Sequence, residues 1–203
     1  MRALRSRRGY TVVELMMAIG VFAIGVSGVI AMQKVTLASN QHAKNLAVAT
    51  HIAQAWMDQL NADAAQWNFP GPRNPSAASD LDDTDWLDQV NNTSAWFRPD
   101  WVATRAFGPG FDALGNPVDG TDQTVFCAHL RLNWLSRDNQ GSVGNGLIRA
   151  EVRVFWLREG VLGGISSEPL CSAADDPAQI GQRPDLYHFV YNASAVRQEA
   201  AQR

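Results

Sequence analysis

A long apolar stretch near the start of the chain is the strongest feature of its hydrophobic pattern. Leu15 to Met32 is a run of 18 residues without a charge, and Tyr10 to Met32 is a largely apolar segment of 23 residues. As an α-helix, a segment of this length spans about 35 Å, which is enough to cross a hydrocarbon core of about 30 Å. The pattern predicts a membrane-spanning helix over residues 10–32.

The helical pattern continues past this segment. Apolar residues recur mostly at intervals of three and four positions, as on one face of an α-helix. No Pro or Gly occurs between Val29 and Phe69, and Pro70-Gly71-Pro72 then ends the pattern. We predict one helix from Tyr10 to about Ala65, with an amphipathic second half that packs under a globular domain. The expected packing residues are Leu46, Ala49, Ile52, Ala53, Trp56 and Leu60.

Other segments alternate apolar and polar residues in the manner of β-strands. They run from Leu130 to Trp134 and from Ile148 to Trp156, and the Gly- and Asn-rich segment 138–146 joins them. This arrangement predicts an antiparallel hairpin. We expect a further strand at 187–191 and a fourth at 101–107. A sheet laid on the second half of the helix would bury the apolar faces of both, so the expected fold is α+β with one core.

The region between helix and sheet has a different composition. Residues 70–123 are rich in Pro, Gly, Asn and Asp, and aromatic residues are spaced through them. We expect an irregular loop region that these rings anchor to the core, although loops of this length are often functional. The anchoring rings are Trp86, Trp96, Phe97 and Trp101. The expected organisation is a basic leader at 1–9, the spanning half of the helix at 10–32 and an exported domain at 33–203, with its sheet region at 124–192.

Charges flank the apolar segment unevenly. Arg2, Arg5, Arg7 and Arg8 precede it, whereas the ten residues after it carry only Lys34. The positive-inside bias places the N-terminus in the cytoplasm and the domain after the span on the exported side. A cleavable signal peptide would have the same basic start. The end of the apolar run at residues 29–33 lacks a small-x-small cleavage site, however, so we expect the segment to be retained.

The remaining charge argues against a nucleic-acid partner. The leader holds four of the 17 basic residues, so the chain from Tyr10 has 13 basic against 20 acidic residues, a formal net charge of −7. Such a surface does not favour a phosphate backbone. Enzyme motifs such as Gly-x-Ser-x-Gly, His-Glu-x-x-His or a phosphate-binding glycine loop are absent from the sequence. We expect a protein that is not an enzyme and binds no cofactor.

The two cysteines and the acidic runs are the candidates for further chemistry. In an exported domain the pair Cys127 and Cys171 predicts a disulfide. A metal site that combines Cys127 with His129 and His188 is the alternative, although no Cys-x-x-Cys signature supports it. Two acidic groups offer carboxylates for calcium but lack the glycine and closing glutamate of an EF-hand loop, so solvated acidic turns are the simpler interpretation. These groups are Asp80, Asp82, Asp83, Asp85 and Asp88, and Asp112, Asn116, Asp119 and Asp122.

Glu14 is the unusual residue of the apolar segment. A carboxylate near the edge of a membrane helix costs roughly 1 to 3 kcal/mol without a partner, which makes it a functional candidate. A position at headgroup depth near a helix N-terminus is the simpler alternative. The sequence Arg8-Gly9-Tyr10-Thr11-Val12-Val13-Glu14-Leu15-Met16 resembles the processing site of type IV prepilins and pseudopilins.

The resemblance implies roles for three residues and for several partners. A prepilin peptidase would cut after Gly9, and the same enzyme would methylate the new N-terminus at Tyr10. Glu14 would be the acidic assembly residue that pairs with the amino group of Tyr10 on a neighbouring subunit. The implied partners are this peptidase and methyltransferase, other major and minor pilins and the inner-membrane assembly platform.

The size of the chain and the segments 24–33 and 47–60 look similar to minor pilins of the PilV kind. This resemblance implies a pilin-like fold and a subunit that initiates, assembles or modifies pili from the inner membrane, with its C-terminal domain in the periplasm and later on the surface pilus. A minor pseudopilin of a type II secretion system is one alternative, since it shares these residue roles. A single-pass anchored periplasmic or surface binding protein is the other.

Overall fold

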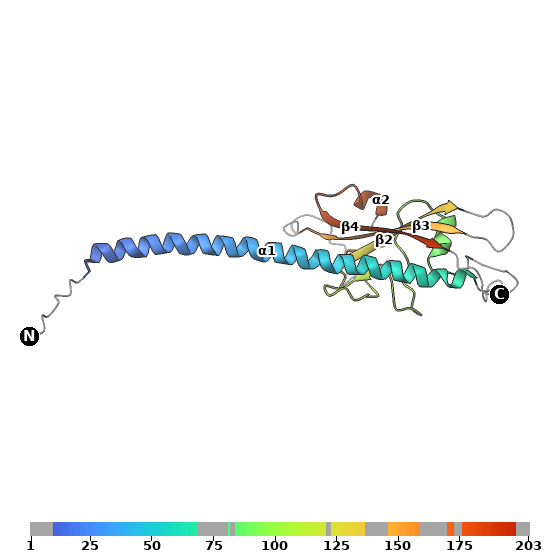
Figure 1. Ribbon diagram of the computed structural model, residues 1–203, viewed down its shortest axis with the longest axis horizontal. Coiled ribbons are helices and arrows are strands. Elements are labelled where there is room, and N and C mark those ends of the chain that lie inside the picture. Colours follow the sequence, from blue (N-terminus) through green and yellow to red (C-terminus); the bar gives the residue numbers. More distant parts are fainter. Residues whose placement is uncertain are drawn as a thin grey trace, which may run out of the picture. The chain divides into compact units, whose positions relative to one another are not determined.

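The computed structural model describes residues 10–68, 81, 84–120, 123–136, 146–158, 170–172 and 176–197. The chain divides into two compact units, residues 1–45 and residues 46–203. Helix α1 (Val12–Ala64) is the only element of the first unit in the described residues and continues into the second. The second unit adds the 3-10 helices η1 (Gln66–Asn68) and η3 (Leu87–Asn91), a short helix α2 (Pro177–Ile180) and a four-stranded sheet (Figure 1).

The long helix forms as predicted. It runs from Val12 to Ala64 without a break and therefore passes through Gly20, Gly25 and Gly28. The expected end near Ala65 is confirmed, and η1 follows at once. The Pro70-Gly71-Pro72 segment, which we expected to stop the helix, lies outside the described residues.

The sheet is antiparallel, with the order β1-β2-β3-β4. Its strands are β1 (Gly110–Phe111), β2 (Phe126–Ser136), β3 (Leu147–Leu157) and β4 (Tyr187–Arg197). The predicted hairpin is confirmed, because β2 pairs with β3 along most of its length; its connection lies outside the described residues except for Gly146. The strand predicted at 187–191 is also present, and it extends to Arg197 because β3 pairs with it throughout.

The prediction of a strand at 101–107 was wrong. Val102 and Phe107 instead pair with each other across a tight turn, in which the Val102 N–H donates to the Phe107 carbonyl at 2.9 Å. Ala106 has a φ of 47°, a left-handed conformation that an extended strand does not contain. The fourth strand is β1, only two residues long, which pairs with the start of β2.

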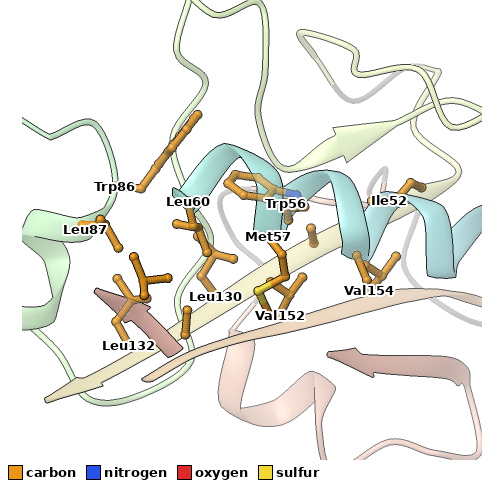
Figure 2. Packing of buried hydrophobic residues seen from close by; sticks show 14 of the residues in the cluster. Ile52, Trp56, Met57, Leu60, Trp86, Leu87, Leu130, Leu132, Val152 and Val154 are labelled. Atoms are coloured by element: carbon orange, nitrogen blue, oxygen red, sulfur yellow. The ribbon is translucent and has the colours of Figure 1, made fainter. Parts of the chain in front are cut away.

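The main core lies between α1 and one face of the sheet. Ile52, Trp56 and Leu60 of the helix are fully buried, as the sequence predicted, whereas Leu46 remains 44% exposed. Figure 2 shows the helix side chains facing Leu130 of β2 and apolar residues of β3. Burial of such side chains contributes about 1.5 to 3 kcal/mol each before conformational entropy is counted. This face of the sheet therefore holds the second half of α1.

A buried carboxylate fixes the loop region to the helix. Asp63, in the last turn of α1, is fully buried and accepts hydrogen bonds from the backbone N–H groups of Asp85, Trp86 and Leu87 at 2.8 to 3.1 Å. The Arg105 guanidinium also donates to it at 3.0 Å. Trp86, thus positioned, packs edge-on against Trp56 in the core. The expectation that rings of the loop region anchor it to the core is confirmed for Trp86.

The expectation of a single core was incomplete, because a second cluster lies on the opposite face of the sheet. Cys127, Phe155, Cys171 and Ile180 are buried there, together with partly buried rings of β4. The segment 170–172 and helix α2 supply its cover, and α2 lies on the side of the sheet away from α1 (Figure 1). We call the face of β2, β3 and β4 that looks away from α1 the outer face. Segment 170–172 and α2 thus bury part of the outer face, which a fold with one core would leave uncovered.

Candidate functional site

The predicted processing and assembly residues lie at the start of α1. Gly9, after which cleavage is expected, lies outside the described residues. Tyr10 is 90% exposed and precedes the helix. Glu14 occupies the third position of α1 and is also exposed. The structure thus places Tyr10 and Glu14 within one helical turn of the helix start.

Glu14 completes a capping box with Thr11. The backbone N–H of Thr11 donates to Glu14 Oε2 at 3.1 Å, and the backbone N–H of Glu14 donates to Thr11 Oγ1 at 3.3 Å. The Thr11 hydroxyl also donates to Oε2, at 3.2 Å. This reciprocal pair satisfies N–H groups that have no partner within the helix. This role of Thr11 was not among the predictions from the sequence, although Thr-x-x-Glu before an apolar run is its signal.

The capping box leaves part of Glu14 available. Within the described residues, both bonds to the carboxylate use Oε2, and no basic side chain lies within ion-pair distance. A carboxylate can accept about four hydrogen bonds on its two oxygens. Glu14 can therefore cap its own helix and still accept a cation from another molecule.

The helix that follows presents apolar side chains all round. Every side chain from Tyr10 to Lys44 is exposed, among them Phe22 at 72% and Ile24 at 75%. The described chain has one helix that is long and apolar enough to cross a membrane, and none of its apolar window is buried. Apolar surface on this scale requires a cover, and a lipid bilayer or other apolar helices would supply it.

Two hydroxyl groups of this segment are satisfied within the helix. The Ser27 hydroxyl donates to the Ile24 carbonyl at 2.8 Å, and the Thr36 hydroxyl donates to the Met32 carbonyl at 2.9 Å. Such back-bonding removes the cost of placing a hydroxyl in an apolar surrounding. A Cβ atom added at Gly20, Gly25 or Gly28 would meet nothing within 4 Å. Packing inside the described chain therefore does not require these glycines.

The predicted disulfide between Cys127 and Cys171 is present, with a Cα–Cα distance of 5.4 Å. The alternative metal site is not assembled, because the Cys127 sulfur is in this bond. His129 is fully buried, and its Nδ1 lies 2.8 Å from Arg153 Nη2. His188 instead lies against the ring of Trp156, on the other face of the sheet. No group of three His, Cys, Asp or Glu side chains in the described part of the chain could hold a metal ion.

Several of the acidic residues considered for calcium have other partners. Asp85 pairs with Arg105. Asp112 caps a turn, accepting from the backbone N–H groups of Leu114 at 2.8 Å and Asn116 at 2.9 Å. Asp88 and Asp119 also lie within the described residues. The remaining acidic positions lie outside them: Asp80, Asp82, Asp83 and Asp122.

The comparisons with known proteins bear on the start of the chain. Residues 4–30 match the family model described as the prokaryotic N-terminal methylation motif. No curated protein and no solved structure matches the chain. The matched region contains the expected cleavage position, the capping box and most of the exposed apolar helix. Together with the long helix and the antiparallel sheet, this motif indicates a type IV pilin-like prepilin.

Proposed function

We propose that this chain is a minor type IV pilin-like structural subunit that initiates, assembles or modifies pili. In this proposal a prepilin peptidase cuts after Gly9 and methylates the new N-terminus at Tyr10. The subunit is not an enzyme and needs no cofactor. Its partners are other pilins and the inner-membrane assembly platform, and its C-terminal domain lies in the periplasm before assembly.

The observation that carries the proposal is the methylation motif, which includes the start of an exposed apolar helix. The motif covers residues 4–30, and the helix begins at Val12, just past the expected cut. A single-pass anchor in the inner membrane fits this arrangement. The same helix could transfer from lipid into a bundle of like helices without exposing apolar surface to water.

Glu14 would set the register of that bundle. Cleavage after Gly9 creates an α-ammonium group at Tyr10, four residues before the carboxylate. Both charges are costly among apolar helices unless they are paired. If Glu14 of one subunit accepts the amino group of Tyr10 on its neighbour, both are neutralised in one axial position. The capping box supports this role because it holds the carboxylate at the helix start.

A Glu14→Gln substitution tests this proposal, because it separates capping from charge. Gln is as good as Glu at this position of a capping box, so the helix start should persist. Loss of a pairing worth roughly 1 to 3 kcal/mol predicts incorporation into sheared surface fibres reduced about tenfold, with processing unchanged. Quantitative immunoblots of the fibre and membrane fractions measure both.

The matched control is Asp58→Asn, which removes an exposed carboxylate from the same helix outside the apolar segment. It should leave incorporation unchanged. If Glu14→Gln also enters fibres at the wild-type level, the carboxylate has no assembly role. A membrane-anchored binding protein would then be the better account.

A further inference from the structure

The outer face carries a small hollow that no part of the proposed function uses. Its volume is about 260 Å³, and it is lined by Trp96, Arg131, Glu151, Tyr191, Asn192 and Ala193. Arg131, Glu151 and Ala193 are opposite one another on β2, β3 and β4. Ala193 is thus the β4 residue opposite Glu151, whereas the β4 residue opposite Arg153 is the much larger Tyr191. The small side chain of Ala193 therefore leaves the space beside the Tyr191 ring.

Arg131 is held in a fixed orientation beside this hollow. Its Nε donates to Glu151, and its guanidinium lies over the Trp96 ring at 4.8 Å from the centroid. A guanidinium has five N–H donors, and only the Nε donor has a partner among the described residues. The terminal Nη groups are thus available in a set geometry. An anion that binds there avoids the entropy cost of ordering a flexible side chain.

The charge around the hollow is positive. Glu151 is shared between Arg131 and Arg149, the latter at 2.6 Å. The Arg153 guanidinium also lies over the Trp96 ring, at 4.6 Å from its centroid, and, in the described residues, pairs with no carboxylate. The outer face therefore carries three guanidinium groups, of which two share the Glu151 carboxylate, in a chain that is acidic after its leader. This local excess favours a negatively charged ligand.

The size and walls of the hollow narrow the class of ligand further. Its volume is below the roughly 300 to 1,000 Å³ of pockets for drug-sized molecules, so it suits a single ring. Tyr191 is 59% exposed, and Trp96 is partly exposed. The electron-rich face of the exposed Tyr191 ring attracts the polarised C–H groups of a pyranose, whereas the Trp96 ring already carries the guanidinium groups of Arg131 and Arg153. An acidic side chain of a protein would reach Arg131 but would leave the Tyr191 ring uncovered.

We propose that the hollow binds a hexuronic acid residue, a pyranose that carries a carboxylate. The carboxylate accepts hydrogen bonds from the Nη groups of Arg131, in the planar geometry that suits guanidinium. The sugar ring packs against Tyr191, beside Trp96 and above Ala193. Binding at this site is independent of the assembly role of Glu14.

Ligand-observed saturation-transfer NMR on the full chain in detergent micelles tests this site, with methyl glucuronide as the probe and empty micelles as the blank. We expect saturation of the glucuronide and at least fivefold less of methyl glucoside, which lacks the carboxylate. Ala193→Phe fills the hollow and should abolish the signal. The matched control is Ala195→Phe, two residues along the same strand and also exposed, which should retain it.

Arg131→Lys provides a second variant that keeps the positive charge but loses the planar guanidinium group with its paired N–H donors. It should weaken glucuronide binding at least fivefold. Several results would overturn the proposal: no saturation of the glucuronide, equal saturation of the glucoside, or wild-type binding by both Ala193→Phe and Arg131→Lys. Equal competition by N-acetylglutamate methylamide would also overturn it, in favour of an acidic protein side chain.

Discussion

At the scale of single residues, His129 and Arg153 form the most unusual buried pair of the domain. Their side chains lie on the outer face, where His129 Nδ1 is 2.8 Å from Arg153 Nη2. Burial, with the nearby charges of Arg153 and Arg98, lowers the pKa of His129 to about 3. The imidazole is therefore neutral at pH 7 and accepts a hydrogen bond from the guanidinium. Arg153 also donates to the Pro177 carbonyl at 2.6 Å and so connects the sheet to α2.

This pair predicts a loss of stability in mild acid. In the unfolded chain His129 should titrate near 6.5, but in the folded domain it stays neutral down to a pKa of about 3. The unfolded state therefore binds a proton that the folded state does not bind. The free energy of unfolding falls as pH drops below about 6.5. Between pH 7 and pH 5 the expected loss in free energy of unfolding is about 2 kcal/mol. Denaturant unfolding followed by tryptophan fluorescence at both pH values measures it.

The variant His129→Gln removes the titrating group and keeps an acceptor for Arg153. Its stability should change between pH 7 and pH 5 by about 2 kcal/mol less than that of the wild type. His51→Gln is the matched control, because His51 is exposed on α1 and should leave the wild-type pH dependence intact. Equal pH dependence in the wild type and His129→Gln would show that His129 is not the group responsible.

Sequence patterns could not reveal this pair. His129 and Arg153 occupy polar positions of two alternating segments, and a period-two pattern assigns such positions to solvent. They are buried because segment 170–172 and α2 cover this part of the sheet. Gly181 allows the segment after α2 to pack closely against Arg153, since a Cβ atom at this position would lie 2.5 Å from Arg153 Nη1. By contrast, the capping role of Thr11 was readable from the spacing to Glu14.

At the scale of elements, the disulfide determines how the outer face is covered. Cys171 lies 44 residues after Cys127, and it joins the segment before α2 to the start of β2. The Arg98 guanidinium donates to the Cys171 carbonyl at 3.3 Å, which adds a second contact. The second cluster is small, with four fully covered residues, and so depends on this link more than the main core does.

Removal of the disulfide should therefore loosen one face of the sheet before the other. Closure of a loop of this length contributes about 4 kcal/mol in the chain-entropy model. The double variant Cys127→Ala, Cys171→Ala should lose about 2 to 5 kcal/mol of unfolding free energy. Hydrogen exchange should show lost amide protection in 176–183 first, while residues 49–64 of α1 stay protected.

Reduction of the wild type with dithiothreitol should reproduce this change, and the double variant should not respond to the reductant. An unchanged denaturation midpoint in the reduced wild type would count against the role assigned to the disulfide. So would simultaneous loss of protection in α1 and in the cover segment.

The elements themselves were predictable to different degrees. The helix and the strands β2 and β3 were predictable from the regular spacing of their apolar residues, because each packs one face against the main core. The two-residue strand β1 is too short to show an alternation of apolar and polar residues, and its place depends on pairing with β2. The segment 101–107 has aromatic residues typical of a strand, but its turn at Ala106 folds it back on itself.

At the scale of the whole molecule, the chain combines an exposed apolar helix with a domain that has its own cores. The first unit keeps none of its apolar window buried, whereas the second buries apolar side chains on both faces of its sheet. Four basic residues precede the apolar segment, and the chain after the leader is acidic. This division suits a subunit that is stored in a membrane through one unit and presents the other outside it.

The measurement that tests this account most directly is the mass of the N-terminal peptide of the protein, isolated from the membrane fraction of its native host. A processed pilin-like subunit predicts a chain that begins at Tyr10 and carries one methyl group on its α-amino nitrogen. A Gly9→Leu variant should retain the leader and fail to reach fibres. A wild-type chain that still contains residues 1–9, or one cut near Met32, would contradict the account.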